Sequence, residues 1–336
     1  MSHVPPHRSC QPIPVGVALA ALLASLGGTG CRTRRVELVV YYASSLSAVL
    51  GDLAAAYQQQ HPSTRVRLEP SGSQVAARKV SELGMKADVV AVADARLIDK
   101  MLIPKHASWN AVFATNEIVI VHKDHSRFTD QITEGNWAEI LARPEVRLGR
   151  GNPDTAPIGY NTLLVWQLAE KSGKLGAAGA DLSKRLLARC APEHVTHDEA
   201  ELLSLLESRA VDYAFLFRST AEDHHLKILT LPPEINLSRP DLAARYQAAS
   251  VEVRMQQGQG KARITGSPVT YGLTIPAKAP HPEAAARFLA FFLGDHGRRL
   301  LDRRGFHPLA HAQCAPCTGL PAPLASLLAP AVATTP

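Results

Sequence analysis

Small hydroxyl residues stand at two places where the chain is predicted to pass from a strand into a helix. The run ASSLS over 43–47 follows an apolar segment at 36–42, and the run SGS over 71–73 follows a second strand-like segment. The first turn of a helix carries unpaired backbone N–H groups and the positive end of the helix dipole. Two such helix starts facing one crevice would bind an anion that brings hydrogen-bond acceptors and no donors.

A simpler interpretation of Ser45 and Ser73 is that each is an ordinary N-cap, which is the commoner role of a single serine at a helix start. The same arrangement recurs, however, in two successive strand–helix units. This recurrence favours a ligand site, with the N-cap as the alternative.

Strand-like and helix-like segments alternate along the rest of the chain. Apolar runs bounded by polar residues occur at 87–94 (ADVVAVAD), 116–123 (NEIVIVHK), 211–219 (VDYAFLFRS) and 269–277 (VTYGLTIPA). Runs of this kind are typical of strands that are buried on both faces of a sheet. A long helix is expected from about Ile158, directly after the polar turn NPDTAP, and the whole pattern predicts an α/β fold.

Residues 1–31 have the pattern of an export signal. The stretch 14–26 is apolar and too short to span a bilayer as a mature helix. The sequence Gly28-Thr29-Gly30-Cys31 behind it resembles the lipobox of bacterial lipoproteins, in which the cysteine is lipidated. We expect an exported protein, periplasmic or at the cell surface, that a lipid on Cys31 anchors to the membrane. Plain secretion with cleavage near Gly30 is the alternative.

Composition and missing motifs exclude several classes of function. The formal charge of +6 is scattered over the chain and aromatic residues make up only 5 %, so no basic stripe or stacking platform for nucleic acid is expected. No G-x-S-x-G, H-E-x-x-H or Walker-type run occurs, and the histidines do not follow zinc-site spacing. The sequence therefore predicts neither an enzyme nor a bound cofactor or metal ion.

The stretch 314–336 is a Pro/Ala-rich tail that we expect to be disordered. It begins with Cys314-Ala-Pro-Cys317. In an exported protein this spacing predicts a small disulfide loop, with a redox pair as the alternative. The redox pair is disfavoured because such a motif belongs at a strand-to-helix junction.

Several segments occur in an order that resembles one protein family. They begin with ASSLS and SGSQVAARKVSELGMKADVVAVAD, continue through FATNEIVIVHKD, NPDTAPIGYNT, VDYAFLFRSTAEDHH and LPPEINL, and end with YGLTIPAKAPHPEAAARFLAFFLGDHGRRLL. This order, which covers about 37–310, is similar to that of the periplasmic molybdate/tungstate-binding proteins, in particular their tungstate-type, archaeal-like branch. The resemblance implies a solute receptor that delivers a tetrahedral oxyanion, molybdate or tungstate, to the permease subunits of an ABC importer.

The same resemblance implies a two-lobed periplasmic-binding-protein fold of type II. Each lobe would be a mixed sheet flanked by helices, with the ligand in the cleft between them. Lobe 1 would comprise 36–117 and 270–313, and lobe 2 would comprise 118–269.

The resemblance also places the ligand contacts. The two serine loops, the turn before the long helix and the end of the strand at 211–219 would each approach the oxyanion, with one tyrosine at the cleft edge. The matching positions are Ser44, Ser45, Ser73, Ala156, Pro157, Ile158, Leu216, Phe217 and Tyr160.

Two of these positions depart from the family pattern. The tungstate-type branch carries an aspartate where this chain has Ala156 and a glutamate where it has Leu216. Those carboxylates would add oxygen ligands to the metal centre, so without them we expect a tetrahedral anion held only by N–H and O–H donors. Asp154 and Arg218 are candidates to compensate, with a loop brace and a surface arginine as their simpler roles. The departures leave open a sensor, or a binder of sulfate or phosphate, on the same fold.

Overall fold

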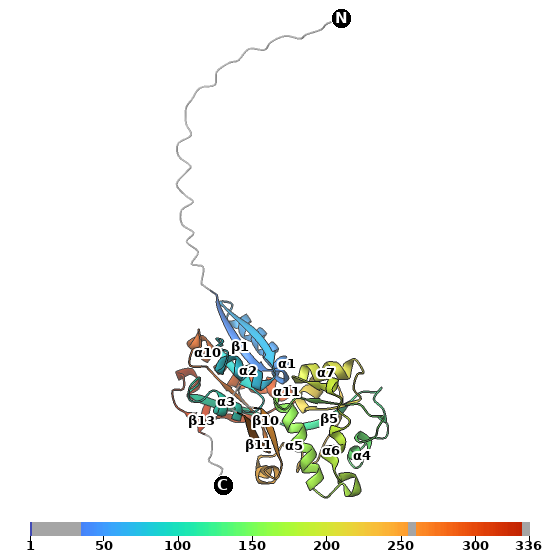
Figure 1. The fold of residues 1–336 in the computed structure, drawn as a ribbon. Coiled ribbons are helices and arrows are strands. Elements are labelled where there is room, and N and C mark those ends of the chain that lie inside the picture. The colour runs from blue at the N-terminus through green and yellow to red at the C-terminus, as the bar shows by residue number, and fades with distance from the viewer. Residues whose placement is uncertain (2–34, 255–259, 331–336) are drawn as a thin grey trace, which may run out of the picture. The chain divides into compact units, whose positions relative to one another are not determined.

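The computed structural model describes Met1, residues 35–254 and residues 260–330. The apolar stretch of the expected signal and Cys31 lie outside these ranges. From Arg35 onward the chain forms one compact unit, which is built on two mixed β-sheets with helices on their faces (Figure 1). The α/β fold with two such sheets, expected from the sequence, is confirmed. We call the first sheet with its helices lobe 1 and the second sheet with its helices lobe 2.

Lobe 1 is built around a seven-stranded sheet of order β14-β13-β4-β12-β3-β1-β2. β1 is parallel to β2 and β3, whereas β12 runs antiparallel to β3 and β4. All four residues of β3 are buried, as a central strand covered on both faces requires. The elements of lobe 1 are β1 (Val36–Ala43), η1 (Ser44–Leu46), α1 (Ser47–Gln60), β2 (Thr64–Ser71), α2 (Ser73–Ser81), β3 (Val89–Val92), α3 (Arg96–Met101), β4 (Trp109–Asn116), β12 (Val269–Thr274), α10 (Pro282–Leu293), α11 (Asp295–Arg303), β13 (His307–Cys317), η5 (Ala322–Leu324) and β14 (Leu328–Pro330).

Lobe 2 is built around a five-stranded sheet of order β7-β6-β8-β5-β9. β6 is parallel to β7 and β8, while β5 runs antiparallel to β8 and β9. Proline stands at the start of its longest helix, where its missing N–H costs no hydrogen bond. Its elements are β5 (Ile118–His122), α4 (Trp137–Leu141), β6 (Leu148–Gly151), α5 (Pro157–Lys171), η2 (Gly176–Gly179), α6 (Leu182–Leu187), η3 (Pro192–His194), β7 (Val195–Thr196), α7 (Glu199–Glu207), β8 (Tyr213–Phe217), α8 (Arg218–Asp223) and β9 (Lys227–Leu229).

The chain crosses between the two sheets twice. The first crossing is short, because β4 ends at Asn116 and β5 begins at Ile118. The return runs through a stretch with η4 (Pro240–Leu242), α9 (Ala243–Tyr246), β10 (Ser250–Arg254) and β11 (Lys261–Thr265), and then enters β12. The β10–β11 hairpin packs along α5, where the Gln167 amide both donates to and accepts from the Ser250 backbone at 3.0 Å.

The expected disordered tail is wrong for residues 314–330. β13 extends to Cys317 along β4, and β14 pairs with β13, so this stretch completes the edge of the lobe 1 sheet. Leu324 and Leu328 are buried, so two leucines within this Pro/Ala-rich stretch supply its apolar contacts with the core. Cys314 and Cys317 form a disulfide, as the spacing predicted.

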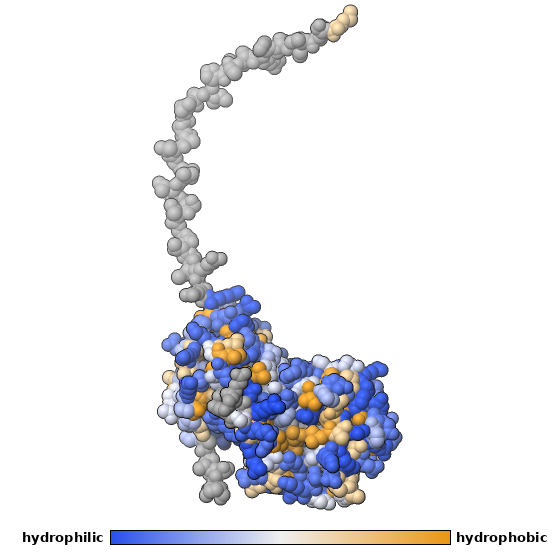
Figure 2. Space-filling view, viewed as in Figure 1, coloured by the Kyte–Doolittle hydropathy of each residue, from blue (hydrophilic) through white to orange (hydrophobic). Residues whose placement is uncertain are grey.

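The apolar residues gather inside both lobes. Trp109, Trp137 and Trp166 are each almost fully buried, the first in lobe 1 and the others in lobe 2. The face shown in Figure 2 is largely hydrophilic, with hydrophobic side chains in small groups. Within residues 35–254 and 260–330, no helix has the length and apolar character needed to cross a membrane.

Candidate functional site

One small pocket brings together strand ends and helix starts from both lobes. The two serine loops of lobe 1 meet the start of α5, the start of α7 and the end of β8 from lobe 2. Seven of the nine residues predicted from the sequence line this pocket. The lining residues are Ala43, Ser44, Ser45, Ser71, Gly72, Ser73, Ala93, Ala156, Pro157, Ile158, Glu199 and Phe217. None of them carries a positively charged side chain, so attraction for an anion must come from backbone dipoles and hydroxyl groups.

Ser73 is fully buried and does not cap its helix. The N-cap of α2 is Gly72, and no side chain caps this end. The Ser73 hydroxyl instead accepts a hydrogen bond from the Ala93 amide at 3.0 Å. Because a hydroxyl that accepts a hydrogen bond still has its own proton to donate, Ser73 keeps a donor for a ligand. The N-cap interpretation is therefore wrong for this residue.

Ser45 is not an N-cap either, because Ala43 and Leu46 are the N-caps of η1 and α1. Like Ser73, it accepts a hydrogen bond from another part of lobe 1. Its hydroxyl accepts a hydrogen bond from the Tyr271 hydroxyl at 3.1 Å. The Tyr271 oxygen in turn lies 3.5 Å from Asn116 Nδ2. Each group in this chain accepts from the one behind it, so the proton of Ser45 is the free end of the chain.

Lobe 2 presents the start of its longest helix to the same pocket. Ala156 is the N-cap of α5 in an extended conformation, and Pro157 occupies the first helical position. Proline has no N–H, so the next backbone donor is that of Ile158, which has no partner within the helix. The side chains of Ala156 and Ile158 are apolar, and their contribution to anion binding is limited to the backbone.

Gly72 lies where the two lobes come closest. A Cβ at this position would sit 2.3 Å from the Thr155 carbonyl oxygen and 3.0 Å from that of His197, both in lobe 2. The φ of Gly72 is −64°, which any residue can adopt. The close approach of the opposite lobe, and not the backbone conformation, therefore requires glycine here.

A carboxyl group that the sequence analysis missed also lines the pocket. Glu199 is the first residue of α7 and is only 3 % exposed. One of its oxygens, Oε1, accepts a hydrogen bond from the Phe217 amide at 2.8 Å. Glu199 therefore occupies the Phe217 N–H, so this residue offers no free backbone donor to a ligand. The expectation of a site without carboxyl groups is wrong, because Glu199 lines the pocket.

The environment of Glu199 favours its neutral form. Burial raises the pKa of Glu199 to about 8, and the nearby charge of Asp198 acts in the same direction, against a partial offset from the Phe217 amide and the Thr220 hydroxyl. The second oxygen, Oε2, is buried and makes no hydrogen bond. In the sequence, Glu199 looked like an ordinary acidic residue in the first turn of a helix, where such residues complement the dipole. Nothing in that pattern distinguishes it from the exposed Glu201.

Two predicted contacts lie away from the pocket. Leu216 is fully buried and packs with Leu202, Leu203 and Leu206 of α7. Neighbouring residues of a strand point to opposite faces, so only Phe217 of this pair reaches the pocket. Tyr160 lies two positions beyond Ile158 in α5 and contacts lobe 1 outside this pocket, through its hydrogen bond to Asp94.

The sequence matches the model of a known family, described as bacterial extracellular solute-binding protein, over residues 38–307. The chain belongs to this family. Two similar relatives illustrate its range. An uncharacterized solute-binding protein of Petrotoga mobilis is 38 % identical over 269 residues, covering 80 % of this chain and 83 % of the relative. The molybdate/tungstate-binding protein WtpA of Pyrococcus abyssi is 34 % identical over 303 residues, covering 83 % and 87 %.

Solved structures of low sequence identity share the fold of this solute-binding protein. The periplasmic molybdate-binding protein of Azotobacter vinelandii has a TM-score of 0.58 at 17 % identity, covering 80 % of this chain and 98 % of that one. The sulfate-binding protein SubI of Mycobacterium tuberculosis has a TM-score of 0.58 at 15 % identity, covering 82 % and 88 %. The two-lobed fold of periplasmic binding proteins is thereby confirmed.

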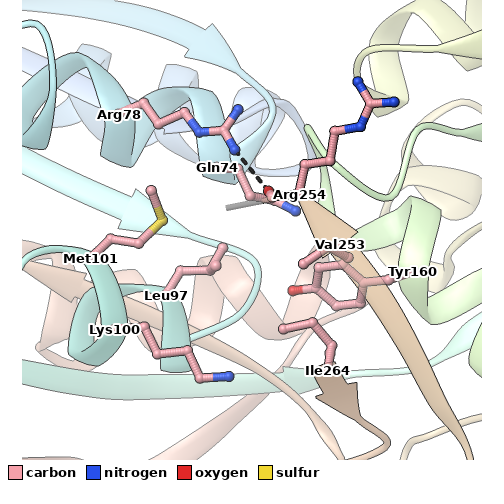
Figure 3. A pocket seen from close by; sticks show the side chains of 9 residues that line it. All are labelled: Gln74, Arg78, Leu97, Lys100, Met101, Tyr160, Val253, Arg254 and Ile264. Atoms are coloured by element: carbon pink, nitrogen blue, oxygen red, sulfur yellow. Dashed lines mark hydrogen bonds between the residues drawn. The ribbon is translucent and has the colours of Figure 1, made fainter. Parts of the chain in front are cut away.

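Several hydrogen bonds join the two lobes of the solute-binding protein beside the pocket. Gln74 Nε2 of α2 donates to the Pro153 carbonyl oxygen at 3.0 Å. Further out, Arg78 Nη2 donates to the Arg254 carbonyl oxygen at 3.1 Å, a contact drawn as a dashed line in Figure 3. These contacts connect α2 with the loop before α5 and with the end of β10.

Tyr160 lines a second, mostly apolar pocket between α2 and α3 on one side and α5, β10 and β11 on the other. Figure 3 shows its ring close to Val253 and Ile264 of the hairpin, with Leu97 of α3 opposite. The Tyr160 hydroxyl donates to Asp94 Oδ2 at 2.6 Å, so it ties α5 to the end of β3. This tyrosine therefore holds the lobes together and does not line the pocket that contains Ser45 and Ser73, which we call the serine pocket.

Asp94 is the centre of this contact. Arg96 approaches both oxygens of the carboxylate, with Nη2 at 2.7 Å from Oδ2, and its Nη1 donates to the Thr265 carbonyl oxygen at 2.9 Å. Burial alone would raise the pKa of Asp94, but the charge and hydrogen bonds of Arg96, with the bond from Tyr160, outweigh it and lower the pKa. Asp94 and Arg96 thus remain ionised at neutral pH while burial keeps Tyr160 a neutral phenol with a raised pKa, and the three residues bridge α5, β3 and β11.

The two candidates for compensation have other partners. Asp154 Oδ1 accepts from the Arg254 amide at 2.7 Å, so Asp154 braces the loop before α5 against β10. Arg218 forms an ion pair with Glu117 and donates to Thr230 Oγ1 at 2.8 Å. Neither residue lines the serine pocket.

Proposed function

We propose that this solute-binding protein captures a tetrahedral oxyanion, molybdate or tungstate, in the serine pocket and delivers it to the permease of an ABC importer. The observation that carries the proposal is the convergence of helix starts from both lobes on one pocket that has hydroxyl donors and no cation. Ser45 and Ser73 each accept a hydrogen bond from the protein and keep a proton to donate. An oxyanion has acceptors on every oxygen and matches this arrangement.

The relatives support the choice of ligand. WtpA of Pyrococcus abyssi and of Thermococcus kodakarensis, each named as a molybdate/tungstate-binding protein, are both 34 % identical to this chain. Capture and delivery of the anion involve no catalytic step. Release to a permease requires the lobes to separate, because the pocket takes its walls from both of them.

We also propose that the mature protein is exported and held at the membrane by a lipid on Cys31. The family to which the chain belongs is described as extracellular, which supports export. The lipid anchor is supported by the lipobox-like Gly28-Thr29-Gly30-Cys31.

Calorimetric titration of the chain from Arg35 onward tests the ligand proposal. Molybdate and tungstate should bind, and sulfate, phosphate and chromate are titrated as competitors. Ser45→Ala should weaken binding by about 1–3 kcal/mol, because the anion loses a donor in a buried site. The matched control is Ser47→Ala, whose hydroxyl donates to the Ser44 carbonyl at 2.6 Å and does not line the pocket. If no oxyanion binds, the proposed function is refuted. If Ser45→Ala and Ser47→Ala lose the same affinity, the anion does not bind at Ser45.

A further inference from the structure

Glu199 is a buried carboxyl group in the pocket wall, and hydroxyl and backbone donors alone would suffice to bind an oxyanion there. It belongs to the pocket wall, its Oε1 is occupied by the Phe217 amide, and its Oε2 is buried without a hydrogen-bond partner. The hydroxyl of Thr220, on the following helix, interacts with this carboxyl closely enough to lower the pKa of Glu199, but neither it nor Oε2 forms a hydrogen bond of good geometry. A buried polar atom without a partner costs free energy, so a ligand that supplies the missing hydrogen bond gains affinity.

We propose that Glu199 is the proton-linked specificity residue of the pocket, which as a neutral acid donates a hydrogen bond from Oε2 to the bound dianion and as a carboxylate opposes binding. This inference rests on the proposed function of oxyanion capture. A carboxylate next to a dianion would add repulsion in a buried site that has no cation to screen it. Protonation removes that repulsion and converts an acceptor into a donor.

The ionisable groups on the elements that pack against α7 have partners other than Glu199. α7 packs against η1, β6, β7 and β8, and neither η1 nor β7 has a titratable side chain. On β6, Arg150 donates to the Gly151 carbonyl oxygen, and on β8, Tyr213 donates to the Arg127 carbonyl oxygen. These groups are therefore directed to other partners.

The remaining charged neighbours do not neutralise the carboxylate. Asp198, the N-cap of α7, is acidic and raises the pKa of Glu199 further. Tyr271 lies behind Ser45, and burial together with the charge of Glu199 raises its pKa, so it stays a neutral phenol. Arg218 is engaged by Glu117. A bound dianion would add negative charge and stabilise the protonated form of Glu199 still more.

The neutral acid also discriminates between oxyanions. Its Oε1 is engaged by the Phe217 amide and its Oε2 carries the proton, so it is a weaker acceptor than a carboxylate for an anion that still has a proton of its own. Hydrogen phosphate has such a proton, whereas tungstate, molybdate and sulfate do not. Glu199 should therefore favour fully deprotonated dianions over hydrogen phosphate.

The test is the affinity for tungstate, which stays a dianion, from about pH 6 to about pH 10 in the parent, Glu199→Gln and Glu201→Gln. The parent affinity should be constant below about pH 8 and should fall about tenfold per pH unit above it, because binding then requires uptake of one proton. Glu199→Gln should bind at every pH like the parent at low pH, since the amide keeps an acceptor for Phe217 and a donor for the anion. Glu201, exposed on the same helix and paired with His197, is the matched control, and its variant should follow the parent.

Four results would contradict this account in different ways. A parent affinity that does not change with pH, or a Glu199→Gln profile that still declines, would overturn the role of Glu199 while leaving oxyanion capture intact. Loss of tungstate binding in Glu199→Gln at all pH values would show that the carboxylate itself is needed as a ligand, which also overturns the proposal. No tungstate, molybdate or sulfate binding by the parent would overturn the function on which it rests.

Discussion

Gly72→Ala should weaken tungstate binding by about 1–3 kcal/mol, roughly a fivefold to hundredfold loss of affinity, while the protein stays folded. The added Cβ would lie 2.3 Å from the Thr155 carbonyl oxygen, a distance that only separation of the lobes can relieve. Alanine fits the backbone conformation of Gly72, so neither lobe should be destabilised on its own. The substitution therefore acts on the approach of the lobes, which the pocket needs for completion.

Small-angle scattering gives the second measurement for this variant. Tungstate should reduce the radius of gyration of the parent, because only the closed arrangement contacts the anion from both lobes, and should reduce it less in Gly72→Ala. Gly51→Ala is the matched control, since a Cβ at Gly51 of α1 meets no atom within 4 Å. If Gly72→Ala closes and binds like the parent, the lobes do not approach each other at Gly72 in the bound state.

Asp94→Asn should lower the free energy of unfolding. Removing one partner of a buried ion pair typically costs about 3–5 kcal/mol, and we expect a loss near the low end of this range. The low end is expected because the Arg96 side chain is 31 % exposed and regains some contact with water. Tyr160 would lose its charged acceptor, so the affinity for the anion should fall as well. Thermal unfolding and calorimetric titration measure the two effects, and an unchanged melting temperature would contradict this account of the contact.

The same contact makes a prediction about pH. The pKa of Asp94 is lower in the folded protein than in the unfolded chain, so its contribution to stability is complete above the unfolded value and is lost as the pH falls through the folded value. Asp94→Asn should therefore lose less stability on acidification than the parent. Asp241→Asn is the control, because Asp241 pairs with Arg239 on the exposed surface, where an ion pair adds little.

The sequence was sufficient to predict the local parts of the site. Strand ends that pass into helix starts are encoded over a few residues, so the serine loops at 43–47 and 71–73 and the turn before Pro157 were found and do line one pocket. The roles of the serines were harder to predict. Ser73 meets Ala93, and Ser45 meets Tyr271, only because the lobe 1 sheet brings the ends of separate strands together, with β1 between β2 and β3, and β3 between β1 and β12.

Glu199 and the C-terminal strands could not be predicted for the same reason. The carboxyl of Glu199 meets the Phe217 amide because α7 packs against the end of β8, a contact that no local pattern shows. The Pro/Ala-rich composition of 314–330 is typical of disorder, but β4 offers it a free edge on which β13 pairs. In both cases a long-range partner determines the structure, and composition or periodicity reports only local preference.

The most direct test of the central claim is X-ray crystallography of the tungstate complex at the tungsten absorption edge, combined with X-ray absorption spectroscopy of the same complex. We predict one anomalous peak in the pocket, within hydrogen-bond reach of the Ser45 and Ser73 hydroxyls through the tungstate oxygens. The absorption spectrum should show only the short metal–oxygen shell of the free tetrahedral anion. A peak elsewhere would contradict the proposed site, and an additional longer oxygen shell would show that a carboxylate, with Glu199 the nearest, binds the metal directly.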